Sequence, residues 1–344
     1  MAGPLERTAY ALGQTARAGV FWGQYWLSGR LTTPVKAPRP IDKPMPGTRR
    51  ILDGLRELFA QDWRNIEAGY YRLPHDLAAS PLQAVVRAGA YFSDLAKVEA
   101  RRHAGSNSEV FEAPHKDRYP RYFLQNFHYQ TDGYLSRHSA ELYDHQVEVL
   151  FGGGADAMRR QALVPLHHFL KERRVRATRL LDLGCGTGRL LSFVKDNYPR
   201  LGVTALDLSP YYLERARALL RPWRDVAFVQ APAEETGLPD AGFDVVTAVF
   251  LFHELPGKVR RAVAAEAGRL LKPGGLFILV DSLQLGDVPE YDGLIEYFPV
   301  AFHEPYYAAY AKSDLEALFA DAGLRTEDVT LAYFSRVMTL RKPD

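Results

Sequence analysis

Cysteine is almost absent from this chain of 344 residues, which contains Cys185 and no other. A single thiol cannot form a disulfide within the chain, and it cannot supply a cysteine-based zinc site. Domains held together by intrachain disulfides or by cysteine-bound zinc are therefore excluded. The composition fits a reducing compartment, and we expect the protein in the cytoplasm.

Long apolar runs and a secretory signal are also lacking. No stretch approaches the roughly 18 uncharged apolar residues that a membrane span requires. The first residues show no basic stretch followed by an apolar core and a small-residue cleavage site. Apolar residues make up 47% of the chain and charged residues 24%, which is typical of a globular protein with a real core. We therefore expect a soluble globular protein.

A strong net charge is the third absence, since the formal charge is only +2. The charge is unevenly spread, because residues 1–50 contain eight Arg or Lys against two acidic residues, a balance of +6 that leaves −4 for the remainder. The main body lacks the positive charge of a nucleic-acid binder, so we predict no nucleic-acid partner. The first 50 residues have the charge to meet an anionic surface.

Residues 5–31 are predicted to form an amphipathic helix, because apolar side chains recur every three or four residues from Leu5 to Val20. Two roles stay open. One is a membrane-surface anchor or targeting segment; the other is a helix packed on the body or on a second copy in a homodimer. A proline-rich stretch follows and is predicted to be an extended linker: Pro34, Pro38, Pro40, Pro44 and Pro46.

Residues 47–154 are predicted to be mainly helical and to form a cap or substrate domain after the arm of residues 1–46. Apolar periodicity indicates helices near residues 51–59 and 82–95. Between residues 119 and 134 the chain is aromatic and polar.

From residue 155 to 344 short apolar strands alternate with helical stretches, which predicts an α/β domain with a parallel, doubly wound sheet. Two further strands, residues 324–331 and 332–341, follow each other directly and are expected to be antiparallel. Ser209-Pro210 and the capping box Ser313-x-x-Glu316 predict two helix starts. The candidate strands of the parallel part of the sheet are residues 179–183, 203–207, 226–230, 243–250 and 276–281.

The strongest motif is Asp182-x-Gly184-x-Gly186-x-Gly188, between the first candidate strand and a helix. Glycines allow a sharp turn there and let a ligand lie against bare backbone, next to free N–H groups of the helix. A nicotinamide enzyme needs the spacing G-x-G-x-x-G, which would place its last glycine at Arg189. The spacing therefore argues against a dinucleotide oxidoreductase.

The glycine spacing behind an acidic residue resembles motif I of class I S-adenosylmethionine (SAM)-dependent methyltransferases, a broad group that includes ubiquinone/menaquinone C-methyltransferases. The resemblance covers roughly residues 160–344 and includes Leu271-Lys272-Pro273-Gly274-Gly275 before the fifth strand. It implies SAM as the cofactor and a seven-stranded Rossmann-like sheet in the order 3-2-1-4-5-7-6 with strand 7 antiparallel. Residues 1–150 resemble no family that we recognise.

The resemblance also implies where SAM binds. Asp207, at the tip of the second strand, is expected to accept hydrogen bonds from the ribose hydroxyls. Pro232 stands where the family commonly has an acid that contacts adenine, so we assign that contact to the backbone of Ala233, helped by Glu234. The full set of expected cofactor contacts is Asp182, Gly184, Cys185, Gly186, Gly188, Asp207, Leu208, Ala233, Glu234 and Phe250.

His253 and Glu254 follow the fourth strand, at the edge of the sheet where ligands of open α/β folds bind. His253 is the first candidate for a catalytic base, oriented by Glu254. The alternative is that His253 only caps the next helix or lines the cofactor pocket.

A long segment, residues 282–312, is predicted to insert as a lid and to roof the substrate together with residues 127–134. Both segments are aromatic and sparsely charged, which favours an apolar or aromatic acceptor. The alternative is that these aromatic side chains only pack the lid onto the body. The candidate substrate contacts are His128, Tyr129, Asp132, Tyr134, His303 and Tyr307.

We therefore predict C- or O-methylation of a hydrophobic small molecule such as a quinone, a phenol or a lipid-like acid, without a metal ion. Methylation of RNA or protein stays open because the first 50 residues are basic. The near-neutral body and the absence of an Asn/Asp-Pro-Pro-Tyr motif count against it. A non-catalytic SAM-binding scaffold also stays open, because the glycine motif concerns the cofactor alone.

Overall fold

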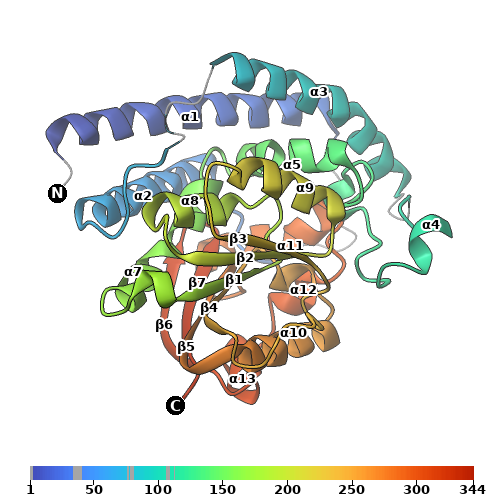
Figure 1. Ribbon diagram of the computed structural model, residues 1–344. Coiled ribbons are helices and arrows are strands. Elements are labelled where there is room, and N and C mark those ends of the chain that lie inside the picture. Colours follow the sequence, from blue (N-terminus) through green and yellow to red (C-terminus); the bar gives the residue numbers. More distant parts are fainter. Residues whose placement is uncertain (1–2, 34–40, 76, 78–80, 106–108, 112) are drawn as a thin grey trace.

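A seven-stranded sheet organises the C-terminal half of the protein (Figure 1). The structure is a computed structural model that describes residues 3–33, 41–75, 77, 81–105, 109–111 and 113–344. The strand order is β3-β2-β1-β4-β5-β7-β6, and β7 is antiparallel to both of its neighbours. The predicted fold class and order are confirmed. The strands are β1 (Arg179–Leu183), β2 (Gly202–Asp207), β3 (Val226–Gln230), β4 (Phe243–Val249), β5 (Leu271–Ser282), β6 (Arg325–Ala332) and β7 (Ser335–Arg341).

The central strands are apolar on both faces because helices cover both sides of the sheet. Side chains alternate along β1, so Leu180 joins one hydrophobic cluster and Leu181 the other, and both are fully buried. The first cluster includes residues of α7 (Leu163–Leu170), α8 (Arg189–Asn197) and α9 (Pro210–Leu220), together with Tyr10, Trp63 and Ile66 of the N-terminal region. The second includes residues of α10 (Gly257–Leu270) and α13 (Leu315–Asp321), together with Phe252 and Tyr310.

Several element boundaries differ from the sequence predictions. The N-cap of α9 is Ser209, as expected, and its side chain accepts a hydrogen bond from the Tyr212 N–H. The predicted capping box at Ser313 is wrong, because the Ser313 hydroxyl donates to the Tyr310 carbonyl and Asp314 caps α13 instead. Strand β5 begins earlier than predicted, at residue 271, and β7 begins later, at residue 335, because residues 333–334 form the turn after β6.

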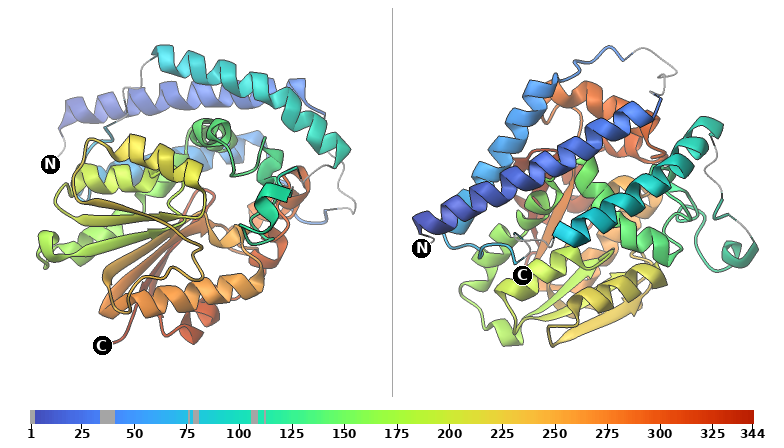
Figure 2. Two further views of the ribbon diagram at one scale, coloured as in Figure 1. Left: turned by 45° about the vertical axis from the view of Figure 1, so that its right-hand side comes forward. Right: turned by 90° about the horizontal axis from the view of Figure 1, so that it is seen from above.

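Helices of the N-terminal region cover one side of the sheet domain. Within this region α1 and α3 form the outer layer, and α5 lies between them and the sheet domain (Figure 2). The division of the chain at residues 46/47 and 154/155 stays a prediction. The proline-rich linker falls mostly on residues outside the described ranges. The helices are α1 (Pro4–Leu31), α2 (Thr48–Glu67), α3 (Pro81–Ala104), α4 (Ala113–Lys116), η1 (Phe127–Tyr129), α5 (Arg137–Leu150) and α6 (Ala155–Arg160).

Helix α1 packs on the body through its polar side. The Tyr10 hydroxyl donates to Asp62 at 2.5 Å, and the Arg17 guanidinium contacts Glu148 and Asp156 at 2.6 and 2.7 Å. Buried carboxylates need such partners, because an unpaired buried charge is costly. The contacts support the packed-helix interpretation of residues 5–31.

The apolar stripe that predicted α1 faces away from the body. Leu5 and Leu12 are 87% and 68% exposed, whereas Gln14 is 5% exposed. The helix is therefore amphipathic, but it turns its polar face to the body and its apolar face to solvent, the opposite of a usual surface helix. None of the described helices combines the length and the apolar character needed to cross a membrane.

The predicted lid, residues 282–312, is folded. It contains η4 (Pro289–Tyr291), α11 (Asp292–Ala301) and α12 (Tyr307–Tyr310). Leu283, Tyr291, Ile295 and Tyr307 form a separate apolar cluster that holds the segment together. Outside the lid, a short helix, η3 (Phe252–Glu254), connects β4 to α10.

Candidate functional site

The glycine turn after β1 is built from three residues with left-handed backbone. Gly184, Gly186 and Gly188 have φ values of 66°, 54° and 79°, which side chains with a Cβ rarely adopt. A Cβ on Gly184 would lie 3.1 Å from Leu251, and one on Gly188 would lie 3.1 Å from Ala216. A Cβ on Gly186 would meet nothing within 4 Å. Gly186 therefore presents bare backbone to open space, where a ligand can lie against it.

Asp207 fixes this turn from the end of β2. Its carboxylate accepts the N–H groups of Gly186 and Ser209, both at 2.8 Å. Burial raises the pKa of Asp207 to about 6, although these hydrogen bonds oppose the shift. The carboxylate is thus held in one position beside the open side of Gly186, as a ribose-binding acid requires. Leu208 follows, and its carbonyl accepts the Gln230 amide at 3.3 Å.

Asp182 and Cys185 support the turn from inside. Asp182 is 2% exposed and accepts a hydrogen bond from the Thr247 hydroxyl at 2.7 Å, across the β1–β4 pair. Burial raises the pKa of Asp182 to about 7. Cys185 is buried, and its N–H donates to the Leu206 carbonyl at 2.8 Å. These positions suit a structural role within the turn.

The remaining expected cofactor residues lie around this edge of the sheet. Ala233 is buried after β3, and the Glu234 carboxylate accepts the Tyr122 hydroxyl at 2.6 Å, which ties the N-terminal region to this loop. Phe250 has a φ of 56°, and its ring stacks on Phe151 with centroids 6.1 Å apart. The described contacts of Glu234 are thus with a tyrosine of the cap.

His253 is paired with Asp281, which the sequence analysis did not single out. His253 Nδ1 and Asp281 Oδ1 are 2.5 Å apart, whereas His253 Nε2 and Glu254 Oε1 are 4.0 Å apart. Asp281, near the end of β5, is therefore the carboxylate in direct contact with His253, and the expected orienting role of Glu254 stays a prediction. Burial lowers the pKa of His253, but Asp281, Glu254 and Glu304 outweigh it and raise the pKa to about 9.

Glu254 points instead toward the cap. Its carboxylate accepts the Tyr134 hydroxyl at 2.5 Å. Burial raises the pKa of Glu254 to about 7, while His253 opposes the shift. The ring of Tyr134 stacks on Phe127 with centroids 5.4 Å apart. Tyr134 therefore closes the site from the N-terminal side.

The lid brings a second acid to the same place. Glu304 lies 3.2 Å from His128 Nε2, and its side chain is fully buried. Burial raises the pKa of Glu304 well above its usual range, and burial lowers the pKa of His128 to about 3. The Tyr307 ring lies 5.8 Å from the His253 ring. Residues from η3, β5, the lid and the cap thus converge.

The other predicted substrate residues lie at the margin of this group. His303 Nε2 faces the Gln125 amide oxygen at 3.0 Å, and the His303 ring contacts that of Tyr129 at 5.7 Å. Asp132 instead lies near Glu109, and its negative charge adds to burial in raising the pKa of Glu109. The structure therefore groups His128 and Tyr134 with His253 and Glu254, and sets Asp132 apart.

Sequence reasoning missed Asp281 and Glu304. Asp281 ends the predicted fifth strand, so its position at the carboxyl edge was a usable signal. Glu304 had no such signal, because the fold of the lid decides where its side chain points.

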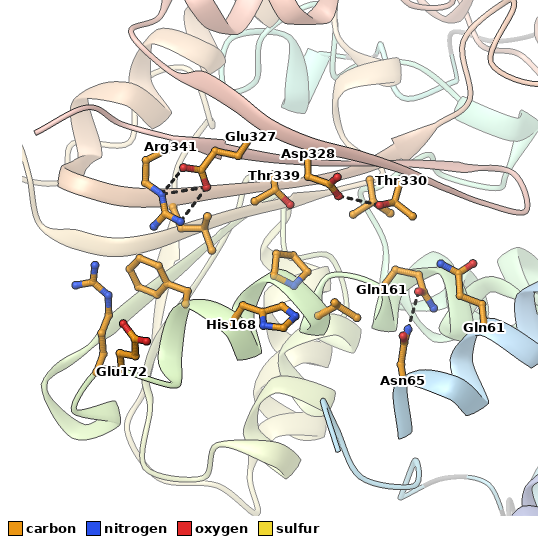
Figure 3. A pocket seen from close by; sticks show the side chains of 16 residues that line it. Gln61, Asn65, Gln161, His168, Glu172, Glu327, Asp328, Thr330, Thr339 and Arg341 are labelled. Atoms are coloured by element: carbon orange, nitrogen blue, oxygen red, sulfur yellow. Dashed lines mark hydrogen bonds and ion pairs between the residues drawn. The ribbon is translucent and has the colours of Figure 1, made fainter. Parts of the chain in front are cut away.

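A separate groove of about 620 Å³ lies on the opposite part of the sheet domain, between α7 and the strands β6 and β7 (Figure 3). His168, Glu172, Glu327 and Arg341 are among its lining residues, and Arg341 pairs with Glu327 at 2.9 Å. Leu276 and Arg341, which line the groove, are the first pair of the β5–β7 ladder. Since none of its lining residues belongs to the glycine turn or to the group around His253, we do not place the chemistry there.

Comparison with known proteins assigns the sheet region to a family. Residues 180–275 match the model of a methyltransferase domain. The chain is 35% identical over 150 residues to the ubiquinone/menaquinone biosynthesis C-methyltransferase of Methylobacterium nodulans, covering 43% of this chain and 57% of that protein. It is 34% identical over 110 residues to the 2-methyl-6-phytyl-1,4-hydroquinone methyltransferase of Synechocystis, covering 32% of this chain and 34% of that protein.

Among solved structures, a SAM-dependent methyltransferase from Aquifex aeolicus has 21% identity and a TM-score of 0.39, covering 53% of this chain and 92% of that one. The chain spans little more than half the length of the first curated relative. Gly186 and Asp207 both lie within the matched residues. The C-terminal part of the chain therefore holds a methyltransferase domain, matched over residues 180–275 within the 3-2-1-4-5-7-6 sheet, and this family implies SAM as the cofactor.

Proposed function

We propose that this protein transfers a methyl group from SAM to an oxygen or carbon atom of an apolar or aromatic small molecule. The observation that carries the proposal is the pair of His253 and Asp281, 2.5 Å apart between Nδ1 and Oδ1. The pair follows β4 and ends β5, at the same sheet edge as the glycine turn after β1. Carbon and oxygen acceptors need a base at this place, whereas a neutral amine does not.

The residues around the pair have three tasks, since SAM itself supplies a strongly electrophilic methyl group. They align the acceptor, remove its proton and exclude water. Asp281 binds Nδ1–H and leaves Nε2 as the basic atom of His253. His253 must be neutral to act, and the positive sulfonium brought into the site favours neutral imidazole. His253 Nε2 would take the proton of the acceptor while the acceptor atom bonds to the methyl carbon, whose bond to the sulfonium sulfur breaks to leave a neutral sulfide.

Aromatic side chains around the converging group support an apolar acceptor. The rings of Phe298 and Phe302 lie 5.9 and 5.8 Å from the His128 ring. Tyr134 and Phe127 form the stacked pair on the cap side. Such walls bind flat or aliphatic groups by burial and leave few polar contacts to direct orientation. The quinone and hydroquinone acceptors in the names of the two curated relatives are of this kind.

The proposal is tested by replacing His253 with Asn, which keeps a donor toward Asp281 and removes Nε2. We expect His253→Asn to lower kcat by about 100- to 10,000-fold, the usual contribution of a positioned base, while the Kd for SAM stays unchanged. Methyl transfer is followed by mass spectrometry with hydroquinones, phenols, fatty acids and bulk tRNA as acceptors. Full activity of the variant refutes the role of His253, and methylation of tRNA alone favours the macromolecular alternative.

We also propose that the outer side of α1 lies on an anionic membrane surface, which would bring the enzyme to lipid-like acceptors. The stripe from Leu5 through Leu12 and Val20 to Leu31 is exposed. Arg30 stacks on Trp26 with its guanidinium carbon 3.9 Å from the ring centroid, and Glu6 is the one acid in α1. An apolar stripe with basic and tryptophan side chains matches an anionic lipid interface.

A further inference from the structure

Three side chains from separate parts of the chain meet beside His253: His128 of η1, Glu254 of η3 and Glu304 of the lid. One ligand atom from each of them lies within 4.8 Å of the other two. We propose that these three residues bind a divalent cation that accepts mixed nitrogen and oxygen ligands, of which Zn²⁺ is the probe. The sequence analysis predicted no metal ion.

The state of Glu304 is the independent observation that points to a ligand. Its side chain is completely buried, and neither carboxylate oxygen has a hydrogen-bond partner of good geometry. The backbone of His128 lies near enough to favour the ionised carboxylate, but too poorly aligned to satisfy it. Buried polar atoms are nearly always paired in folded proteins. A cation between Glu304 and its neighbours satisfies both oxygens.

The donor set and its spacing suit such an ion. Zinc binds imidazole nitrogen and carboxylate oxygen at about 2.0–2.2 Å, so two ligands of one ion lie at most about 4.4 Å apart. The observed spread of up to 4.8 Å needs only small side-chain rotations to reach this. One imidazole with two carboxylates is typical of ions of intermediate softness.

The chain holds His128 in place at some cost. His128 and Tyr129 both have a φ of 55°, a left-handed conformation that is unfavourable for residues with a Cβ. Arg101 stabilises this turn by donating to the Tyr129 carbonyl at 2.9 Å, and the Asn126 amide donates to the Gln130 carbonyl at 3.0 Å. The left-handed turn is what directs the imidazole to Glu304.

Three protein ligands leave a coordination position free, as in catalytic zinc sites. The free position would take the acceptor's oxygen, and the cation would lower the pKa of that hydroxyl before His253 removes its proton. This role rests on the proposed function. The cation site itself does not, because it follows from the contacts of Glu304.

The test measures metal binding without any acceptor. Full-length protein is treated with a chelator, dialysed and titrated with Zn²⁺ by calorimetry, and Co²⁺ is added in parallel to follow its visible absorption. We expect one Zn²⁺ per chain with a Kd in the micromolar range or below. Glu304→Gln and His128→Gln, which keep side-chain size, should each weaken binding at least tenfold. His303→Gln is the matched control, since His303 neighbours Glu304 but faces Gln125.

The SAM affinity of each variant shows that the sheet domain is folded. Glu304→Gln should also raise the melting temperature of the metal-free protein, because an unsatisfied buried acid is removed. Absence of one-to-one Zn²⁺ binding, or equal binding by Glu304→Gln, overturns the cation site and leaves the methyl-transfer proposal to its own test with His253→Asn. If protein treated with a chelator transfers methyl groups at the same rate as untreated protein, the role of the ion in catalysis is overturned.

Discussion

Gly186 and Gly188 offer a matched pair of substitutions that separates ligand binding from folding. Both residues have left-handed backbone, so alanine at either position costs roughly 1–2 kcal/mol of strain. The two differ in what a methyl group would meet. At Gly188 it would lie 3.1 Å from both Ala216 Cβ and Leu220 Cδ1, whereas at Gly186 it would meet open space.

The strain and the contacts set the expected magnitudes. Gly186→Ala should lower the free energy of unfolding by about 1 kcal/mol, because reduced freedom of the unfolded chain offsets part of the strain. Gly188→Ala should add an overpacking cost of about 1–3 kcal/mol against α9. For SAM the order is reversed, because the methyl group of Gly186→Ala occupies the space where the ligand lies. We expect its Kd to rise at least tenfold, which corresponds to about 1.4 kcal/mol.

Calorimetric titration with SAM and thermal melting of both variants check these values. Gly188→Ala should show the larger fall in melting temperature, and Gly186→Ala the larger loss of SAM affinity. If Gly186→Ala binds SAM as tightly as the unchanged protein, the cofactor does not lie against this backbone and the assignment of the site is refuted.

Three further predictions concern Asp182 and the N-terminal helix. Burial raises the folded pKa of Asp182 to about 7 from an unfolded value of 3.8, so its stabilising contribution is complete below pH 3.8 and is lost as the pH rises through about 7. Asp182→Asn should therefore gain more melting temperature relative to the unchanged protein at pH 8.5 than at pH 5.5, and a pH-independent difference contradicts this. The double variant Leu12→Glu and Val20→Glu should bind vesicles that contain anionic lipid at least tenfold more weakly, with an unchanged melting temperature. Ala16→Ser, on the same side of the helix, is the control and should bind the vesicles normally. Equal vesicle binding by the double variant rules out the membrane proposal. Deletion of residues 1–46 should destabilise the protein, because it leaves Asp62 and Glu148 with fewer partners; an unchanged melting temperature would show that α1 contributes nothing to the fold.

The sheet domain could be predicted from sequence because its signals are local. Each parallel strand is a short apolar run, and the glycine turn has a spacing that few functions need. Strand order 3-2-1-4-5-7-6 came from resemblance, since apolar runs do not specify their neighbours. The exact ends of β5 and β7 were missed because the hydrogen bonds between strands, and not the apolar run, decide where a strand begins.

The reaction site was harder to predict, because its residues meet only after folding. The partner of His253 is Asp281, 28 residues away, and Glu304 joins from a lid whose course the sequence does not specify. The packing side of α1 was hidden for a related reason. Its apolar stripe suggested burial, but the buried acids Asp62, Glu148 and Asp156 attract its polar side through Tyr10 and Arg17.

Strand β7 has a consequence for the order in which the sheet assembles. It lies between β5 and β6, although it follows both of them along the chain. Until β7 inserts, β5 has an unpaired edge of apolar residues and β6 has no partner in the sheet. A folding intermediate in which β1 to β5 have already associated therefore exposes a template for intermolecular strand pairing. Refolding yield should therefore fall steeply as protein concentration rises. The fraction of molecules that fold without aggregating should depend on how fast the β6–β7 hairpin docks onto β5.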